Sequence, residues 1–537
     1  MSSASPIAID EPVVARQADR RRSSRVFLIS WALASLVGII WALATPLGGS
    51  PDEPAHLVKA ASVARGQFVG EPAEIGHVVQ VPRYIADTHE VACLVFDINA
   101  SADCYEDAPA SPAELVDAGT TAGLYNPLYY LVVGWPSLVF DDATGIYAMR
   151  IMNALFTALF LGFAVRFAFE LGRRSLTVAA IGVAFTPTLA FLSGAVNPNA
   201  VEVTATIAAF MAMLAVVRRR SDAPIGGALA IAAVSAAVGA QMRGLSPVWI
   251  ALALALPLVL VPWARLKELL ARRVVWVTII AVVVAAALAG LWTVGSSSLT
   301  GAIDADWEIP PYPGTGSSPL TGFVVMLLST FGYGMQMVGS FGWLDTPAPD
   351  PVYFVWATLT GAIVLAGIAV LRGRRLVFGG LLTLALLLFP PIFQAAYVTA
   401  GGFIWQGRYT LPLFGIAVVG IAVVVGDRLA ESSFGQQTSG SERRLFGAVW
   451  LAWALSQAYC LPTALKRSAI GADGSWGQLI RSPEWSAPGG NLTLIVAYVV
   501  LIFAIAFTAW WATTRRPLAA RPLPEDRPQD EAVQSAG

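Results

Sequence analysis

The chain has 537 residues, of which 56% are hydrophobic and only 13% are charged, and its mean hydropathy is +0.65. A water-soluble fold cannot bury that much apolar surface, so the composition excludes a soluble globular protein and indicates a polytopic membrane protein. The formal net charge of −1, without a basic domain or stripe, gives no reason to expect nucleic acid as a partner.

The chain opens with a polar segment followed by a long apolar one. Residues 1–25 end in the basic run RRRSSR, and residues 26–47 are nearly all apolar. That length crosses a hydrocarbon core of about 30 Å. The ALA at 42–44 resembles a signal-peptidase site, but the apolar run exceeds the roughly 7–15 residues of a signal-peptide core. We therefore expect a disordered cytoplasmic N-terminal tail and a retained signal anchor.

Arginine clusters predict the topology of the rest, because Arg and Lys gather in cytoplasmic loops. With the N-terminus inside, about twelve spans within a transmembrane domain over 26–512 place every cluster in the cytoplasm. The tail, 513–537, is then cytoplasmic too, and its Pro-rich, charged composition predicts disorder. The clusters are at 172–174, 218–220, 265–273, 372–375, 442–444 and 515–516. The spans are expected to begin near Val26, Tyr147, Ser175, Pro198, Ile225, Leu245, Val274, Val352, Leu376, Phe403, Leu445 and Leu494.

Two apolar stretches are not expected to span. Residues 128–140 are too few, and residues 323–343 contain four glycines and would, as a span, move the next arginine cluster outside. Both are therefore predicted to be helices or re-entrant pieces at the outer surface. This topology leaves outer segments at 48–146, 295–350 and 465–490.

Two of the three cysteines lie in the large outer loop. Cys93 and Cys104 are expected to form a disulfide, since an extracytoplasmic loop is oxidising; two free thiols are the alternative. Cys460 lies in an apolar span, where a cysteine usually acts as a small hydrophobic residue.

The segment GGSPDEPAHL, residues 48–57, places Asp52, Glu53 and His56 just outside the first span. Pro54 suits an early helical position, so one of the two carboxylates could cap a helix. Capping accounts for one carboxylate but not for the second, nor for His56. These three residues are therefore candidates for a catalytic site.

Two further arginines, Arg243 in QMRGLSP and Arg408 in WQGRYTLP, lie at outer ends of spans against the positive-inside rule. A charge so close to hydrocarbon is costly and is usually paired or functional. The planar guanidinium can bind two oxygens of a lipid phosphate at once. The alternative is a structural ion pair with Asp52, Glu53 or Glu202. Other polar motifs at outer ends are YNPLYY (125–130), AMRIMN (148–153) and SGAVNPNAVE (193–202).

The order of the motifs resembles that of the GT-C superfamily. A signal anchor is followed by PDEPAH, a large outer loop, YNPLYY and an arginine that opens the second span. These polytopic glycosyltransferases use polyprenyl-phosphate sugars, and they include protein O-mannosyltransferases and lipid A aminoarabinose transferases. PDEPAH, SGAVNPNA and QGRYTLP together resemble one member group, domain-of-unknown-function family 2142. The Ala-, Val- and Arg-rich composition suggests the actinobacterial type. The resemblance covers roughly 26–512 and implies an all-α, GT-C-like bundle of about twelve transmembrane helices. Its large first outer loop would carry interfacial helices.

The resemblance also implies a reaction. A sugar would move with inversion from a polyprenyl-phosphate donor to an extracytoplasmic cell-envelope glycan or glycolipid at the surface of the membrane lipid. One carboxylate base suffices for inversion, because polyprenyl phosphate leaves as a stable anion. The acidic position of the family maps onto Asp52, the first choice, or Glu53, the second. The other carboxylate would hold a divalent metal such as Mg or Mn, align the acceptor, or cap the helix.

Further roles follow from the same resemblance. His56 would orient the phosphate or a carboxylate, and Arg408 would neutralise the departing phosphate. YNPLYY departs from the family by placing Asn126 where relatives often have a first proline, which puts the details of that loop in doubt. The helpers proposed for Arg408 are Arg243, Arg150 and Tyr409. The substrate-lining candidates are Asn126, Tyr129, Asn197, Asn199 and Gln406.

Two other classes of protein compete with the enzyme. A transporter or flippase of lipid-linked saccharides usually places ionisable groups near the bilayer midplane and shows repeats or paired broken helices. A non-catalytic envelope-assembly protein has no use for carboxylates and arginines that converge. The polar motifs here gather at one face and no repeat is evident, which favours the enzyme.

Overall fold

The computed structural model describes residues 13–74, 76–95, 97–104, 111–297, 312–431 and 439–514. Within these residues, nine helices are long and apolar enough to cross a membrane. In chain order they are α1 (Val13–Ala44), α5 (Ala143–Ala168), α8 (Pro198–Arg218), α12 (Arg273–Gly295), α15 (Asp350–Val370), α16 (Gly373–Gly401), α17 (Leu411–Glu431), α18 (Ser439–Ile470) and α20 (Asn491–Thr514). The predicted all-α polytopic fold is confirmed.

Shorter apolar helices supply the remaining predicted segments. The α6 (Arg174–Ala184) and α7 (Pro187–Ser193) helices form one apolar pair bent by 66°. The α9 (Gly226–Ala240) and α10 (Ser246–Ala255) helices are short, and η4 (Leu256–Leu260) continues α10. Each of the twelve expected spans therefore coincides with an apolar helix.

One span begins later than the sequence predicts. The span expected near Phe403 starts as η5 (Gly407–Thr410) and continues as α17. The delay has a local cause, because Gly402 has a φ of +69° and turns the chain after α16.

The prediction of a disordered N-terminal tail is wrong for part of its length. Helix α1 begins at Val13, so residues 13–25 continue the first span as helix. Ala, Gln and Arg, which fill much of this segment, are good helix formers. Residues 1–12 and 515–537, where the other calls of disorder fall, lie outside the described residues.

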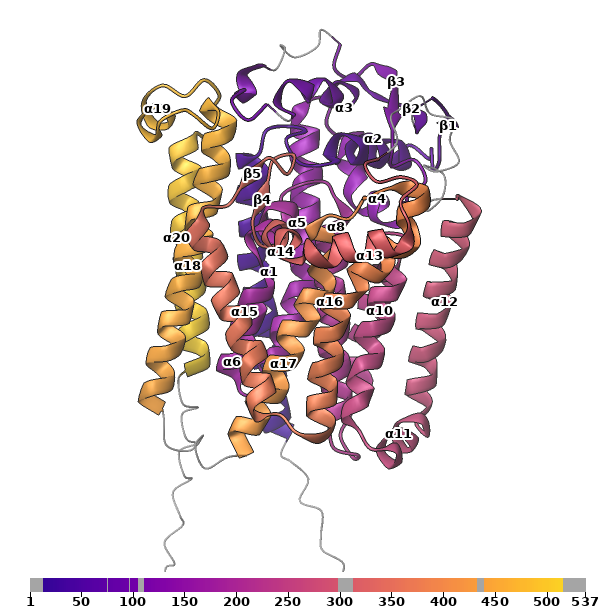
Figure 1. Cartoon of the computed structure of the whole chain (residues 1–537), viewed down its shortest axis with the longest axis vertical. Helices are drawn as coiled ribbons and strands as arrows, with labels where there is room; N and C mark the ends of the chain where they lie inside the picture. Colours follow the sequence, from indigo (N-terminus) through magenta and orange to yellow (C-terminus); the bar gives the residue numbers. More distant parts are fainter. Residues whose placement is uncertain are drawn as a thin grey trace, which may run out of the picture.

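The outer segment before α15 contains helices that do not cross the bundle. The α13 (Pro319–Leu328) and α14 (Thr330–Val338) helices meet at an angle of 56°. Figure 1 shows both lying across the long helices. A two-stranded ladder of β4 (Ser340–Phe341) and β5 (Thr346–Pro347) follows them.

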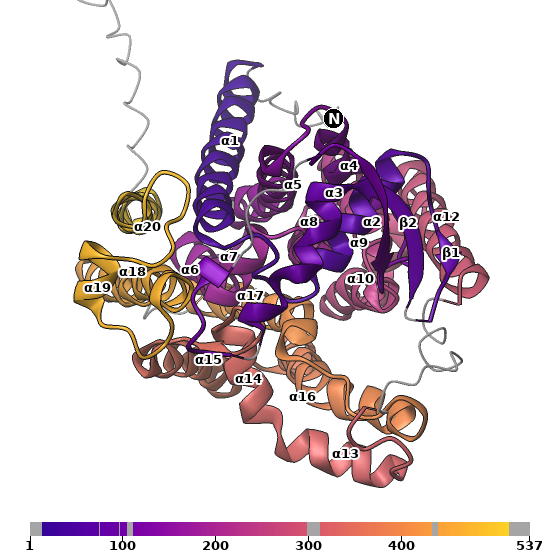
Figure 2. The ribbon, with the colours of Figure 1, turned by 90° about the horizontal axis from the view of Figure 1, so that it is seen from above.

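The large outer loop forms a layer over one end of the bundle, and this layer contains a small sheet that the sequence analysis did not predict. In the sheet, β2 (His77–Pro82) pairs antiparallel with β1 (Glu71–Pro72) and with β3 (Leu115–Thr120). The layer also holds α2 (Glu53–Ala64), α3 (Arg83–Ala86), η1 (Asp87–Leu94), η2 (Ala102–Cys104), α4 (Pro127–Gly134) and η3 (Trp135–Leu138). Figures 1 and 2 show the layer above the bundle. Two helices lie elsewhere: α11 (Trp263–Leu270) at the opposite end and α19 (Trp476–Arg481) beside α18 and α20.

Helix α2, which follows the acidic motif, is packed tightly in this layer. Its apolar residues Leu57 and Ala61 share a buried cluster with Tyr129 and Tyr130 of α4 and with residues of α5 and α8. A Cβ atom at Gly134 would lie 2.2 Å from the carbonyl oxygen of Ala60, so α4 can approach α2 this closely only with glycine there. This packing fixes the start of α2, and with it the acidic motif.

Candidate functional site

Asp52 occupies the N-cap position of α2, but its side chain makes no capping hydrogen bond. Its backbone has a φ of 63°, a left-handed conformation that is uncommon outside glycine, although Asp tolerates it better than most residues. The side chain is 47% exposed, and Arg408 donates a hydrogen bond from Nη2 to its Oδ2. Strain of this kind often marks a functional site. The geometry therefore gives no support to the interpretation of Asp52 as a helix cap.

Glu53, although adjacent, is buried and paired with Arg150. Arg150 donates from Nε and Nη2 to the two carboxylate oxygens at 2.8 and 2.5 Å, and the backbone N–H of Val196 donates to Oε1 at 2.9 Å. Arg150 also binds the carbonyl oxygens of Ala42, Thr45 and Pro46. This ion pair joins the end of α1, the start of α2, α5 and the turn before α8. The sequence analysis gave Glu53 as the second choice of base and Arg150 as a helper at the phosphate, whereas here each is occupied by the other in a buried ion pair.

His56 lies one turn into α2 and is buried. Its Nδ1 is 2.8 Å from the hydroxyl oxygen of Tyr130, and its ring meets the ring of Tyr125 edge to face. Burial lowers the pKa of His56 to about 3, Asp52 opposes this shift, and the nearby arginines add to it. The imidazole is therefore neutral at pH 7.

Arg408, in η5, is buried with part of its hydrogen-bonding capacity unused. Its Nη2 binds Asp52, while Nε and Nη1 have no hydrogen-bond partner among the described residues. Tyr409 lies between Arg408 and Arg243, whose guanidinium carbons are 5.4 and 4.2 Å from the centre of its ring. Unpaired N–H groups on a buried cation are costly, which makes this a site prepared for an anion.

The same residues control the charge of Asp52. Burial by itself would raise the pKa of the Asp52 carboxyl. The positive charges of Arg408 and Arg243 lower it, and the net pKa lies below its usual value. Asp52 is thus an ionised and accessible carboxylate in contact with a buried arginine.

The asparagine candidates have structural contacts. Asn126 caps α4 through the backbone N–H of Leu128 and donates to the side chain of Gln241 at 2.6 Å. Asn197 caps α8 and donates to the carbonyl oxygen of Pro51 at 3.2 Å. Asn199 donates to Glu202 at 3.3 Å. These bonds hold the ends of helices around the site.

The last two lining candidates differ in their contacts. The Tyr129 hydroxyl donates to Asn153 at 2.9 Å, deep in the contact between α4 and α5. Gln406 comes two residues before Arg408, and its buried Oε1 has no partner among the described residues. Gln406 therefore retains an unused acceptor among the described residues, whereas Tyr129 belongs to the packing.

A cavity of about 190 Å³ adjoins this site, and Arg243 and Tyr409 lie on its wall with Glu202. From the sequence, Glu202 was expected only as an ion-pair partner, and most of the aromatic residues of the cavity were not predicted. Their signal was weak, because tryptophan and tyrosine near span ends are ordinary components of a membrane interface. The aromatic lining includes Tyr125, Trp249, Trp292, Phe393, Tyr397 and Trp405.

The described residues offer little to a divalent cation. No group of three or more His, Cys, Asp or Glu side chains comes together in the described ranges as a set of metal ligands. Asp52 and Glu53, the two candidate ligands, are each paired with an arginine. We therefore derive no step through Mg or Mn.

The fold and the site define a multi-pass α-helical membrane protein with a carboxylate–arginine site at one end of its bundle. The chain belongs to the family described as predicted membrane protein DUF2142, whose model matches residues 35–417. No curated protein sequence matches it.

Solved structures with some similarity to the chain come from two kinds of protein. ArnT from Cupriavidus metallidurans in the apo state is 14% identical, with a TM-score of 0.41, and the match covers 93% of this chain and 78% of that one. The Archaeoglobus fulgidus oligosaccharyltransferase in the apo form is 12% identical, with a TM-score of 0.34 and coverages of 90% and 56%. AglB from the same organism, in complex with an inhibitory peptide and a dolichol-phosphate, is also 12% identical, with a TM-score of 0.27 and coverages of 91% and 55%. The chain thus spans just over half the length of these two oligosaccharyltransferases.

Proposed function

We propose that this protein is a GT-C-type glycosyltransferase. It moves a sugar from a polyprenyl-phosphate donor to an acceptor of the cell envelope, outside the cytoplasmic membrane. The observation that carries the proposal is the pairing of the buried Arg408 with the exposed carboxylate of Asp52, because two of the three guanidinium nitrogens of Arg408 have no hydrogen-bond partner among the described residues. The guanidinium of Arg408 can bind a phosphate, and the carboxylate of Asp52 can accept a proton from an acceptor hydroxyl.

The phosphate argument starts from the cost of burying Arg408. A buried guanidinium is stable when its donors are satisfied, and Asp52 is bonded to only one of its three nitrogens. Nε and Nη1 lie on the two different edges of the guanidinium, each edge being completed by Nη2, so each can donate to an oxygen of a phosphate. Tyr409 lies beside it. A lipid phosphate entering here would therefore accept hydrogen bonds from the two unpartnered nitrogens of Arg408.

Asp52 serves as the base in this proposal. The acceptor oxygen forms a bond to the anomeric carbon, the bond from that carbon to the phosphate oxygen breaks, and the acceptor proton passes to the Asp52 carboxylate. The released polyprenyl phosphate keeps the electron pair and is stabilised by Arg408. The low pKa of Asp52 keeps the base ionised at neutral pH. Attack from the side opposite the phosphate inverts the anomeric centre.

The membrane position of the site agrees with a lipid-linked substrate. By the positive-inside rule the layer that carries Asp52 lies outside and both termini lie in the cytoplasm. The acceptor is then a glycan or glycolipid of the envelope, and the membrane lipid is the medium from which the donor arrives.

The test measures the rate of transfer and the binding of the lipid phosphate separately, which distinguishes the proposed roles of Asp52 and Arg408. Asp52→Asn should bind farnesyl phosphate normally and lose roughly a hundredfold to ten-thousandfold in the rate of transfer from farnesyl-phosphate sugars to envelope glycolipids. Arg408→Ala should weaken farnesyl-phosphate binding at least tenfold, since a hydrogen bond to a charged group contributes about 1.5–3 kcal/mol. Asp117→Asn on exposed β3 and Arg481→Ala at the end of α19 serve as matched controls and should change neither quantity.

Two outcomes would contradict the proposal. Near-normal transfer by Asp52→Asn would remove Asp52 as the base. Translocation of a fluorescent polyprenyl-phosphate sugar across proteoliposomes, with no covalent transfer by the wild type, would favour a flippase instead.

A further inference from the structure

The cavity beside Tyr409 has the chemistry of a small sugar site. We infer that it binds the sugar ring of the lipid-phosphate donor. This ring is an uncharged, hydroxyl-rich monosaccharide, and Glu202 accepts hydrogen bonds from its hydroxyl groups. This inference rests on the proposed function, because it assumes that the phosphate lies at Arg408.

Position is the first argument. Tyr409 lies on the wall of the cavity and also contacts Arg408, the proposed phosphate binder. Arg243, which also lines the cavity, has its guanidinium carbon 4.2 Å from the centre of the Tyr409 ring. A ring attached directly to a phosphate at Arg408 would therefore reach the cavity past Tyr409.

Size is the second argument. The cavity measures about 190 Å³, below the range of about 300–1,000 Å³ typical of sites for drug-sized ligands. A single monosaccharide ring suits this volume, whereas a polyprenyl chain or an oligosaccharide does not. The long isoprenoid tail must then remain outside the cavity, against the bundle or in the lipid.

The distribution of wall chemistry is the third argument. The wall includes aromatic side chains from α12 and α16, such as Trp292 and Tyr397, together with Trp405. It also includes polar side chains, Glu202 and Gln241 among them. A pyranose needs both kinds of partner, because its C–H faces pack on aromatic rings and its hydroxyl groups need hydrogen-bond partners.

Glu202 is the acceptor with capacity to spare. Its Oε1 accepts from Ser246 at 2.5 Å and its Oε2 from Asn199 at 3.3 Å, and Trp249 also bonds to the carboxylate, which with about four lone-pair sites can still accept a further bond. Gln241, by contrast, is engaged at both ends, by Asn126 and by the carbonyl oxygen of Ala285. Arg243 lines the same cavity with the opposite charge, so the walls are balanced and favour a neutral ring over a charged one.

The experiment measures what the sugar adds to binding. Dissociation constants are compared in detergent for farnesyl phosphate and for its glucose, mannose and galactose esters. The wild type should bind at least one ester tenfold or more tightly than farnesyl phosphate. Glu202→Gln should reduce the ratio of ester affinity to farnesyl-phosphate affinity to about one, without changing the affinity for farnesyl phosphate. If this variant does not fold, Tyr397→Leu, at a half-buried position, should have the same effect. Tyr459→Leu, a half-exposed tyrosine on α18, is the control and should keep the ratio.

Other outcomes overturn the inference. If no ester binds better than farnesyl phosphate, or if both variants keep the wild-type ratio, the cavity is not a sugar site. If phosphatidylglycerol competes with the ester in the wild type and loses affinity in the variants, the cavity binds an ordinary lipid headgroup. Failure of the proposed function looks different, because Arg408→Ala would then leave farnesyl-phosphate binding unchanged.

Discussion

Asp52 and Glu53 are neighbours in the chain, yet one is accessible and the other is fully buried. They differ because α2 begins between them. Glu53 is the first helical residue and points into the bundle toward Arg150, whereas Asp52 lies in a left-handed turn that directs its side chain to Arg408. Two adjacent carboxylates thus reach arginines from different elements, one for stability and one for the proposed chemistry.

This difference predicts opposite effects of the two amide variants. Glu53→Gln leaves Arg150 as a buried charge without its counterion, and breaking such a pair typically costs about 3–5 kcal/mol. Asp52→Asn removes a charge from a 47% exposed side chain and should change stability by less than about 1 kcal/mol. Thermal unfolding in detergent should therefore show a much lower midpoint for Glu53→Gln only. A wild-type midpoint for Glu53→Gln would contradict the structural assignment of the ion pair.

His56 makes the stability of the outer layer depend on pH. Its pKa is about 3 in the folded protein against 6.5 in a model peptide, so between these values the unfolded state binds a proton that the folded state does not. Stability should fall as the pH drops below 6.5, by about 1.4 kcal/mol per pH unit from this group alone. At about pH 4.5 the loss should reach roughly 2–3 kcal/mol.

The variant His56→Asn isolates this contribution, since an amide does not titrate and can still bond to the Tyr130 hydroxyl. The difference in unfolding midpoint between wild type and variant should therefore depend on pH, becoming less favourable to the wild type on acidification. A difference that stays constant between about pH 7 and about pH 4.5 would contradict the pKa shift.

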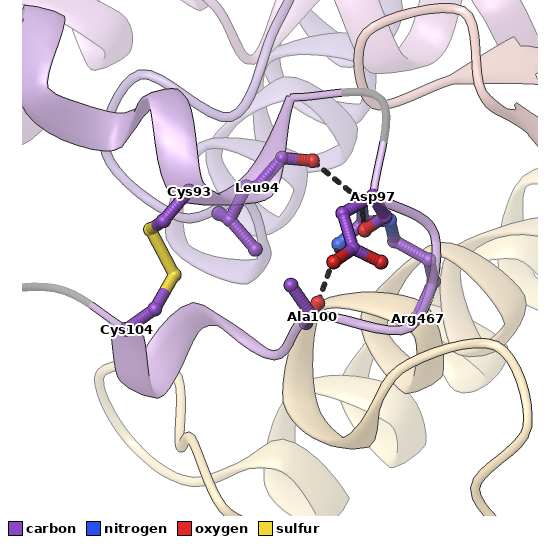
Figure 3. Close-up of a disulfide and its surroundings, with 6 residues drawn as sticks. All are labelled: Cys93, Leu94, Asp97, Ala100, Cys104 and Arg467. Carbon is purple, nitrogen blue, oxygen red and sulfur yellow. Dashed lines mark hydrogen bonds between the residues drawn. A yellow bond between two sulfur atoms is a disulfide. The ribbon is translucent and has the colours of Figure 1, made fainter.

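At the scale of elements, one arginine connects three outer segments that are far apart in the chain. Arg467 near the end of α18 donates to the carbonyl oxygens of Leu94, Asp97 and Ala100 at 2.7–2.9 Å and to the Asp345 carboxylate at 3.0 Å. The same loop is closed by a Cys93–Cys104 disulfide (Figure 3). The loop is thus held by both a covalent bond and an ion-pair network.

Removing this arginine should loosen the loop. Arg467→Ala leaves three carbonyl groups and a buried carboxylate without their donor, and we expect a loss of roughly 3 kcal/mol together with faster proteolysis between residues 94 and 104. Arg481→Ala, an exposed arginine at the end of α19, is the control. Equal digestion rates for the two variants would show that Arg467 does not hold the loop.

The disulfide itself can be tested separately. Peptide mapping of unreduced protein from its native membrane should find the peptides with Cys93 and Cys104 joined. The bond closes a short loop, so its loss should cost about 2–3 kcal/mol in a chain-entropy model. Recovery of both residues as free thiols would contradict this prediction.

At the scale of the whole molecule, the topology determines which side of the membrane the site faces. The start of α1 and the end of α20 both lie at the end of the bundle opposite the layer that contains α2 (Figure 1). Helices α13 and α14 lie across the bundle, so the basic cluster before α16 stays on the same side as the earlier ones. Were this pair a span, every later segment would change sides.

Labelling with an impermeant thiol reagent on intact cells tests this arrangement. Single cysteines at Thr315 and Asp473 should be labelled, and cysteines at Asp222 and Arg374 should not. Background should be low, because Cys460 is buried and the other two cysteines are joined. Labelling at position 374 but not at 473 would show that α13 and α14 form a span.

The sequence by itself determined the class of the protein and the order of its helices. Apolar length and arginine placement are properties of single segments, and the bilayer imposes the same requirement on each of them. For this reason the spans could be located from the sequence. The end of the N-terminal tail and the delayed start of α17 were not predicted correctly. Residues 13–25 favour helix by composition, and the turn at Gly402 was not recognised.

Only the tertiary structure decided how the polar residues pair. The alternatives for the carboxylates Asp52 and Glu53, and for the arginines Arg243 and Arg408, could not be separated by spacing, because the partners come from distant parts of the chain. Whether a charged side chain is neutralised by an ion pair or can bind a ligand depends on its burial and on the residues around it, and neither is a local property of the sequence. The same reason explains why Glu202 was noticed only as a possible ion-pair partner: the cavity on which its proposed further role depends exists only when five helices, η5 and three connecting loops are packed together.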